Sequence, residues 1–276
     1  MKGLGSSSRG VVSLKKSTTT GPVWVVTGAS SGIGRAIALE LAATGASLCL
    51  QGCANLAGIC ETADLVAQRG ATSRIFMLDL SEPSSCHTLV LGAFATHGRV
   101  DGWIHVAGAD VLTGSASRQP FVSKLERLWR VDVQGTILCT RLAGERMRLQ
   151  ARCSQQTPTI LTMGWDQAEA GMEGDSGQFF AATKGAVMAF SRSLAKTLGP
   201  EVRVNCIAPG WIQTLWGRSA PPLWDQRARG ESMLGRWGTA EDIAKVAKFL
   251  LSPESQFLNG QILAVNGGWK PAWPAP

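Results

Sequence analysis

Tyrosine is missing from this chain altogether, although the chain has 276 residues and ten tryptophans. Histidine occurs only three times, and none of the seven cysteines belongs to a Cys-x-x-Cys pair. These scarcities argue against a structural zinc site, and we expect no metal centre. No apolar run approaches the roughly 20 residues that span a bilayer, so no membrane partner is expected either.

The cysteines are odd in number and scattered, which favours a reducing compartment and predicts a cytoplasmic protein. Acidic residues are fewer than basic ones, and the net charge is +7. Nucleic-acid binders gather their lysines and arginines into a stripe. Here the basic residues are spread along the chain, so no nucleic-acid partner is predicted. The excess charge fits an ordinary basic surface, or attraction for a phosphorylated cofactor or an acidic carrier.

The two ends of the chain differ in composition from the middle. Residues 1–20 combine Ser, Thr and Gly with basic residues and no acid, which predicts a disordered tail. A weaker likeness to an organellar transit peptide lacks the amphipathic pattern of such segments. Residues 21–270 are expected to form a single domain with a large buried core, and residues 271–276 a C-terminal tail.

Strand and helix patterns alternate from residue 22 onward. Helical spacing is clear at Ile33, Ile37 and Leu41, and residues 61–69 form a second helical pattern closed by Gly70. Short apolar runs predict seven strands, at 23–26, 47–50, 75–78, 103–106, 159–162, 202–206 and 262–265. This alternation predicts a doubly wound α/β (Rossmann) fold, a seven-stranded parallel sheet with helices on both faces. Ligands of such sheets bind beyond the carboxyl ends of the strands.

A glycine-rich turn separates the first predicted strand from the first predicted helix. Glycine permits a tight turn and a close approach of backbone to pyrophosphate, and the helix N-terminus offers free N–H groups and a positive dipole end. Between a strand and a helix, such a turn predicts dinucleotide binding. The residues expected to contact the cofactor here are Gly28, Ser30, Ser31, Gly32, Ile33 and Gly34.

The Gly-x-x-x-Gly-x-Gly spacing of this turn resembles the short-chain dehydrogenase/reductase family, especially its 3-oxoacyl-carrier-protein reductases. Further matches extend the resemblance over about residues 21–269, including the turns around Asn259 and Asn266. The resemblance implies a nicotinamide-dependent oxidoreductase that acts on a small molecule and assembles as a homotetramer or homodimer. It also implies cofactor contacts by Asp79, Leu80, Ala107, Gly108, Pro209, Gly210, Ile212 and Thr214.

The end of the second predicted strand bears on the choice of dinucleotide. NAD-preferring enzymes place an acid there, which binds the ribose 2′-hydroxyl. Gly52 and Cys53 occupy this place, so no carboxylate would repel a 2′-phosphate. The arginine that NADP-preferring relatives often carry at the position of Cys53 is also missing, and Arg35 is either its substitute or a solvated helix residue. We expect NADP(H) in preference to NAD(H).

The catalytic positions depart from the family pattern. In that pattern a tyrosine four residues before a lysine gives the proton, a serine orients the substrate, and an asparagine supports them. Here Phe180 replaces the tyrosine, Asp132 replaces the asparagine, and no serine stands at the expected distance. His105 replaces another family asparagine and is expected to be a buried histidine with satisfied hydrogen bonds. Lys184 remains and, by resemblance, is expected to bind the nicotinamide ribose.

The source of a proton is therefore open. Phe180 has no exchangeable proton and cannot act as a general acid. In the loop 165–177, Asp166 and Asp175 are the candidates for a carboxyl with a raised pKa that acts as donor. Alternatively, the substrate needs little enzymic protonation, as with an imine or an activated double bond. Asp132 is expected to keep a structural hydrogen bond.

The segment 211–237 corresponds to the variable substrate lid of the family, and it is rich in tryptophan. Such a lid suits an apolar or ring-containing carbonyl, imine or activated alkene, unless the tryptophans only pack the lid. Its arginines either meet an acidic substrate group or are solvated; they are Arg218, Arg227, Arg229 and Arg236. The predicted function is an NAD(P)-dependent oxidoreductase. The missing tyrosine and serine motivate the alternative, a dinucleotide-binding regulatory or sensor protein of impaired catalysis.

Overall fold

The computed structural model describes residues 21–43, 45–151, 157–214, 217 and 220–270, so the expected tails at 1–20 and 271–276 lie outside the described residues. Within them, seven parallel strands form one sheet in the order β3-β2-β1-β4-β5-β6-β7. The predicted doubly wound parallel sheet is confirmed. Its strands are β1 (Val23–Val26), β2 (Ser47–Gly52), β3 (Thr72–Met77), β4 (Gly102–His105), β5 (Thr159–Met163), β6 (Arg203–Pro209) and β7 (Ile262–Val265).

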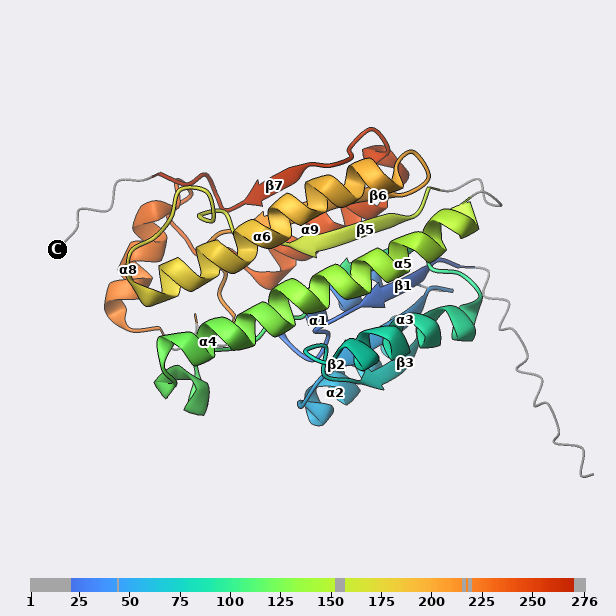
Figure 1. Ribbon diagram of the computed structural model, residues 1–276, viewed down its shortest axis with the longest axis horizontal. Coiled ribbons are helices and arrows are strands. Elements are labelled where there is room, and N and C mark those ends of the chain that lie inside the picture. Colours follow the sequence, from blue (N-terminus) through green and yellow to red (C-terminus); the bar gives the residue numbers. More distant parts are fainter. Residues whose placement is uncertain (1–20, 44, 152–156, 215–216, 218–219, 271–276) are drawn as a thin grey trace, which may run out of the picture.

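Helices cover both faces of this sheet (Figure 1). On one face, Ile37, Ile59 and Ile243 join a buried core that is shared by α1 (Gly32–Leu41), α2 (Leu56–Gln68) and α9 (Ala240–Leu251). On the other face, Trp103 lies at 0% exposure in a second core beneath α3 (Pro83–His97), α5 (Thr136–Ala151) and α6 (Gly174–Leu198). The remaining segments are η1 (Gly114–Arg118), α4 (Phe121–Leu128), the π-helix η2 (Trp129–Gly135), α8 (Pro222–Glu231) and η3 (Pro253–Ser255).

Two elements begin three or more residues before the positions that the sequence predicts. Helix α2 begins at Leu56 rather than at residue 61, because the side chain of Asn55 caps it by accepting a hydrogen bond of 2.9 Å from the Gly58 N–H. Strand β3 begins at Thr72, three residues before the predicted run. Its first residues are polar and exposed, so hydrophobicity does not reveal them, yet they pair in register with β2 from Ser47 onward.

The strand order reverses between β1 and β4, which lie side by side at the centre of the sheet. The chain leaves these two strands toward opposite halves of the sheet, and a crevice opens beyond their carboxyl ends. The turn after β1 and the loops after β4, β5 and β6 meet there. Among the helices of the described residues, none has the length and apolar character that crossing a membrane requires.

Candidate active site

The turn after β1 is closed by two contacts that only glycine allows. Gly28 has a φ of +66°, and a Cβ on it would lie 3.0 Å from the backbone of Ala107. A Cβ on Gly34 would lie 2.2 Å from the carbonyl oxygen of Gly28. Helix α1 begins beyond this turn with no side-chain cap, so its first N–H groups remain available to an anion. The turn thus has the shape and polarity that a pyrophosphate requires.

Two adjoining cavities extend from this turn along the carboxyl edge of the sheet. The larger encloses about 1030 Å³ and the smaller about 440 Å³. They share the lining residues Ile33, Val106, Leu112, Phe180 and Thr214.

All the residues expected to contact the cofactor lie around these two cavities. The larger cavity is lined by Gly28, Ser30, Ser31, Gly32, Ile33, Gly34, Asp79, Leu80, Ala107, Gly108 and Thr214. The smaller cavity is lined by Lys184, Pro209, Gly210, Ile212 and Thr214, and also by Ile33. The residues present therefore fit a dinucleotide with its phosphates at the turn and its nicotinamide toward Lys184.

Sequence reasoning missed Gln51, which fixes the position of the turn. Its side chain is buried, accepts a hydrogen bond of 3.0 Å from the Gly28 N–H and donates one of 2.7 Å to the Leu78 carbonyl. One residue thus joins the phosphate turn to β2 and to the end of β3. A polar residue inside an otherwise apolar strand was the available signal, because a buried amide needs partners.

The end of the larger cavity beside Cys53 has an unexpected basic residue. Arg35 is half-buried and does not line the cavity: its guanidinium donates to the carbonyls of Ser30 and Gly58, each at 2.9 Å, and pairs with Glu61 at 2.8 Å. Arg127 of α4 lines the cavity instead, together with Cys53. Burial, and to a smaller extent the charge of Asp79, raises the pKa of the Cys53 thiol, against the lowering effect of the Arg127 charge.

An ion pair stands at the other end, beside the smaller cavity. The Lys184 ammonium lies 2.8 Å from a carboxylate oxygen of Asp132, whose side chain is only 2% exposed. The second oxygen of this carboxylate accepts a hydrogen bond of 2.7 Å from the Ala109 N–H. Asp132 reaches both partners from the π-helix η2, a local widening of the helix that often occurs at functional sites. The expected hydrogen bond of Asp132 is present, and the salt bridge is an addition.

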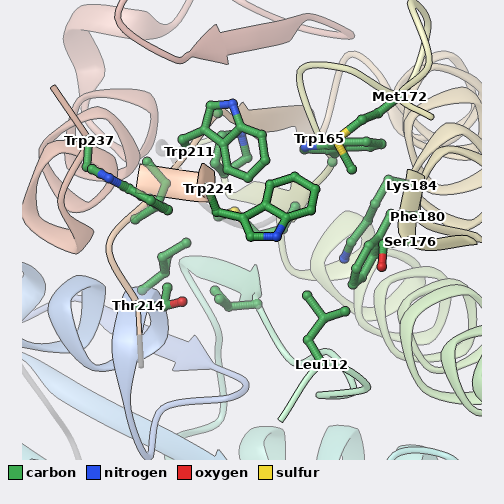
Figure 2. Close-up of a pocket in the computed structure, with 17 residues that line it drawn as sticks. Leu112, Trp165, Met172, Ser176, Phe180, Lys184, Trp211, Thr214, Trp224 and Trp237 are labelled. Atoms are coloured by element: carbon green, nitrogen blue, oxygen red, sulfur yellow. The ribbon is translucent and has the colours of Figure 1, made fainter. Parts of the chain in front are cut away.

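Phe180 lies one helical turn before Lys184 and faces the same cavity (Figure 2). Its ring meets that of Trp165 edge-on, with 6.3 Å between the centroids. Ser176 precedes Phe180 by four residues of α6 and also lines the cavity. Sequence reasoning missed this hydroxyl, although positions four residues apart share a helix face. Gly164, which directly follows β5, also lines the cavity. A serine at this position would not fit without a shift, because its Cβ would lie 2.7 Å from the side chain of Met188.

The two carboxylates considered as proton donors lie outside the lining of the smaller cavity. Asp166 turns toward Asn266, whose amide donates a hydrogen bond of 3.0 Å to it. Burial raises the pKa of Asp166 to about 6, against the lowering effect of this hydrogen bond. Asp175 is exposed in the first turn of α6. The structure therefore brings Asp132, Phe180 and Lys184 together and leaves these two acids apart from them.

His105 is buried at the end of β4, as the sequence predicts, but neither ring nitrogen has a hydrogen-bond partner among the described residues. Burial, and to a smaller extent the charge of Lys184, lowers the pKa of His105 to about 3. The imidazole is therefore neutral at physiological pH. It does not line either cavity.

The smaller cavity has mainly aromatic and aliphatic walls. Besides Phe180, the aromatic rings come from Trp165, Trp211, Trp224 and Trp237, as Figure 2 shows. The Trp211 and Trp224 centroids are 5.8 Å apart, and those of Trp211 and Trp237 are 5.9 Å apart. The tryptophans of the lid thus line a cavity as well as packing against one another.

The three described arginines of the lid pair with acids of this chain. Arg227 is buried, contrary to a solvated position, and pairs with Glu231 at 2.8 Å and with Glu173. Arg229 and Arg236 pair with the acids Asp225 and Asp242, at 2.9 and 2.7 Å. Trp216 and Arg218 lie outside the described residues.

A dinucleotide cradle at the switch point of a parallel sheet, beside a lysine and an apolar cavity, defines a nucleotide-binding α/β oxidoreductase. Comparison with known proteins narrows this class. Residues 28–270 match the family model described as enoyl-(acyl carrier protein) reductase. The chain belongs to the short-chain dehydrogenase/reductase family and is an NAD(P)-dependent oxidoreductase of that type.

Its relatives act on chemically different molecules, according to their names. The chain is 31% identical to 2-dehydro-3-deoxy-D-gluconate 5-dehydrogenase of Bacillus subtilis, with 90% of this chain and 94% of the relative covered. It is 33% identical to cyclohexanol dehydrogenase of a Rhodococcus species, with 90% and 96% covered. A 7α-hydroxysteroid dehydrogenase, solved with NADH and 7-oxo glycochenodeoxycholic acid, matches with a TM-score of 0.80 and 28% identity over 91% and 95% of the two chains.

Proposed function

We propose that this protein transfers a hydride between NADP(H) and an apolar or ring-containing carbonyl, imine or activated alkene, with proton donation that differs from the family pattern. The observation that carries the proposal is that two cavities with five shared lining residues extend from the phosphate turn to Lys184. The cofactor supplies the hydride when bound. The chain holds it through the turn, and Lys184 fixes the nicotinamide ribose beside the aromatic cavity.

The apolar part of this proposal is supported by the walls of the smaller cavity. A volume of about 440 Å³ lined by indole and phenyl rings suits a compact ring system. The names of two relatives point to cyclohexanol and to a hydroxysteroid, both ring compounds. The name of another points to a polar sugar acid. The proposal of an apolar or ring-containing substrate is therefore supported by the cavity walls rather than by the names of the relatives.

The placement of the acids bears on how the substrate obtains a proton. An acid from the loop 165–177 would have to move to reach the cavity, because Asp166 faces Asn266 and Asp175 is exposed. This placement favours an acceptor that needs little enzymic protonation, an imine or an activated double bond. Ser176 and Thr214 supply hydroxyls that can orient such an acceptor.

The test is NADPH oxidation measured against a panel of ketones, imines and enoyl compounds, with the wild type and Phe180→Tyr. We expect the wild type to reduce imines or activated alkenes and to leave simple ketones unchanged. Phe180→Tyr restores the general acid and should gain at least about tenfold on ketones, within the range that acid catalysis contributes. If NADPH binds but nothing in the panel is reduced, the function fails, and a dinucleotide-binding regulatory or sensor protein becomes the better description.

The preference for NADP(H) is proposed on the charges around the adenosine end. No carboxylate ends β2, and Arg127 offers a guanidinium to a 2′-phosphate. We expect Arg127→Ala to raise the KM for NADPH about tenfold and to leave that for NADH within twofold, since only NADPH carries the phosphate. Arg69→Ala, at the exposed far end of α2, is the matched control. Equal effects on both cofactors would contradict the assignment of Arg127.

Two further properties are proposed from the sequence, self-association from the family resemblance and a cytoplasmic location from the scattered, odd-numbered cysteines. We expect the chain to self-associate as a homotetramer or homodimer, which light scattering on the purified protein would measure. We also expect it to work in the cytoplasm, which imaging of a fluorescent fusion would test. Neither property enters the chemistry above.

A further inference from the structure

The smaller cavity offers little acid to a substrate. Its lining among the described residues includes no carboxyl, phenol or imidazole group. The hydroxyls of Ser176 and Thr214 are weaker acids than the phenol of a tyrosine, and Lys184 is already paired with Asp132. A neutral ketone needs a proton as it accepts a hydride. A substrate that is already a cation needs none.

The charge of the site is also unusual. In the family pattern that the sequence resembles, an asparagine stands at the position of Asp132, and the lysine keeps its full positive charge. Here the carboxylate of Asp132 lies 2.8 Å from the ammonium of Lys184, and both side chains are largely buried, at 2% and 16% exposure. Water screens such a pair weakly, so the two charges cancel at close range. The site therefore lacks the net positive charge that would repel a cation.

The aromatic walls favour a cation as well. The N–H groups of Trp211 and Trp237 each donate a hydrogen bond of 2.8 Å to a carboxylate, of Glu231 and Asp225 respectively. A carboxylate at the N–H makes an indole more electron-rich, and the face of an aromatic ring attracts positive charge. Arg227 already lies 5.5 Å from the centre of the Trp224 ring, and its own charge is balanced by Glu231 and Glu173.

We propose that the substrate is a cyclic iminium cation, an inference that rests on the oxidoreductase function proposed above. The iminium carbon accepts the hydride, the π electrons of the C=N bond become the lone pair on nitrogen, and a neutral amine leaves. The reduced nicotinamide is oxidised, and no proton is added. This chemistry accounts together for the loss of the catalytic tyrosine, the exchange of asparagine for Asp132 and the tryptophan-lined cavity.

The direct test compares matched rings that differ in charge. N-methyl-dihydroisoquinolinium is the cation, α-tetralone the neutral ketone, and a cyclic enone the neutral activated alkene. With NADPH and the full chain, we expect turnover of the iminium salt at least tenfold above both neutral compounds. We also expect its kcat to stay constant from neutral to alkaline pH, because a quaternary iminium carries no titrating proton.

Four variants separate the effects of charge, aromatic contact and proton donation. Asp132→Asn retains a hydrogen-bond acceptor for Ala109 but restores the positive charge, and it should lower kcat/KM for the cation by about tenfold to a hundredfold, with a smaller effect on the enone. Trp224→Leu should lower kcat/KM for the cation by roughly twofold to thirtyfold. Trp224→Phe keeps an aromatic face, so its loss in kcat/KM should be smaller. Phe180→Tyr should not accelerate reduction of the cation.

A binding measurement gives a readout other than activity. The unreactive N,N-dimethyl-tetrahydroisoquinolinium should quench tryptophan fluorescence with a lower Kd than neutral dimethyltetralin, and Asp132→Asn should remove the difference. Faster reduction of the enone or ketone, or equal binding of the two analogues, would overturn the cationic substrate and leave the oxidoreductase function standing. No reduction of any compound by a protein that binds NADPH would remove both.

Discussion

Asp132 and Lys184 show how a single side chain changes the electrostatics of a site without changing its geometry. An asparagine at position 132 could accept the same hydrogen bond from the Ala109 N–H. The aspartate adds a negative charge next to the Lys184 ammonium and turns a cationic site into a neutral pair. The family pattern predicts the location of both residues. Their ion pair depends on the distance between η2 and α6, which only the structure supplies.

Asp166 makes the free energy of unfolding depend on pH. Burial raises its pKa from 3.8 to about 6, so folding favours the protonated form. The stabilisation from Asp166 is fully present at a pH below the pKa of this carboxyl in the unfolded chain. It is lost as the pH rises through the higher pKa of the folded chain. We expect the stability contributed by Asp166 to fall by on the order of 2 kcal/mol between about pH 4 and pH 6.5.

The measurement is urea unfolding across that pH range for the wild type and Asp166→Asn. The asparagine cannot titrate, so the stability of the variant should change less with pH and should match or exceed the wild type at neutral pH. Asp64→Asn, an exposed position on α2, is the control for the loss of one surface carboxylate. Parallel pH profiles for the wild type and Asp166→Asn would show that Asp166 has no raised pKa.

At the scale of the element, α6 organises the candidate site. Ser176, Phe180 and Lys184 are spaced by four residues, and all three line the same cavity. The same helix face continues beyond Lys184 with Val187, Leu194 and Leu198, which are buried and anchor the helix. Its neighbour η2 adopts π-helical geometry and aims Asp132 at the last of the three. Two helices therefore place the ion pair and the three α6 residues of the cavity wall.

Helix α9 carries a capping box that should contribute measurably to stability. The Thr239 hydroxyl accepts a hydrogen bond of 3.2 Å from the Asp242 N–H, and the Asp242 carboxylate accepts one of 2.9 Å from the Thr239 N–H. We expect Thr239→Ala to cost about 1 kcal/mol, which lowers the Tm by roughly 2–4 °C in a chain of this size. Thr239→Ser keeps the hydroxyl and should stay near the wild type in calorimetry. Equal losses in both variants would assign the effect to the methyl group.

At the scale of the whole molecule, the cofactor cavity joins both halves of the sheet. One half supplies the phosphate turn and the end of β3, while the other supplies Lys184 and the segment after β6. The two halves meet between β1 and β4, where the strand order reverses. A dinucleotide bound there contacts residues that are far apart in the sequence, so binding should stabilise the folded chain as a unit.

This linkage predicts a rise in Tm with cofactor. At a concentration a hundredfold above its Kd, NADPH should add about 2.7 kcal/mol to the free energy of unfolding. We expect a larger rise with NADPH than with NADH at equal concentration, because of Arg127. Differential scanning fluorimetry checks both expectations, with AMP as a control that occupies only the adenosine end. If neither NADPH nor NADH changed the Tm, binding at the crevice between β1 and β4 would be contradicted.

Local sequence patterns are enough to predict the sheet and the phosphate turn. Apolar runs separated by helical patterns place every strand, and the glycines at 28 and 34 have no substitute, since a Cβ at either would meet backbone within 3.0 Å. The predicted starts of α2 and β3 were wrong because polar residues form these starts, namely the Asn55 cap of α2 and the exposed first residues of β3. Such contributions are local hydrogen bonds, and a hydrophobic pattern does not record them.

Only the tertiary structure decided how the catalytic region is arranged. The sequence gathered Asp166 and Asp175 near the site because both follow β5, but the fold directs one toward Asn266 and the other into solvent. The fold places Arg127 and Ser176 in the walls of the two cavities, and it brings Asp132 into an ion pair with Lys184. The physical reason is that strand and helix positions follow from local periodicity, whereas the direction of a side chain follows from packing between segments distant in the chain.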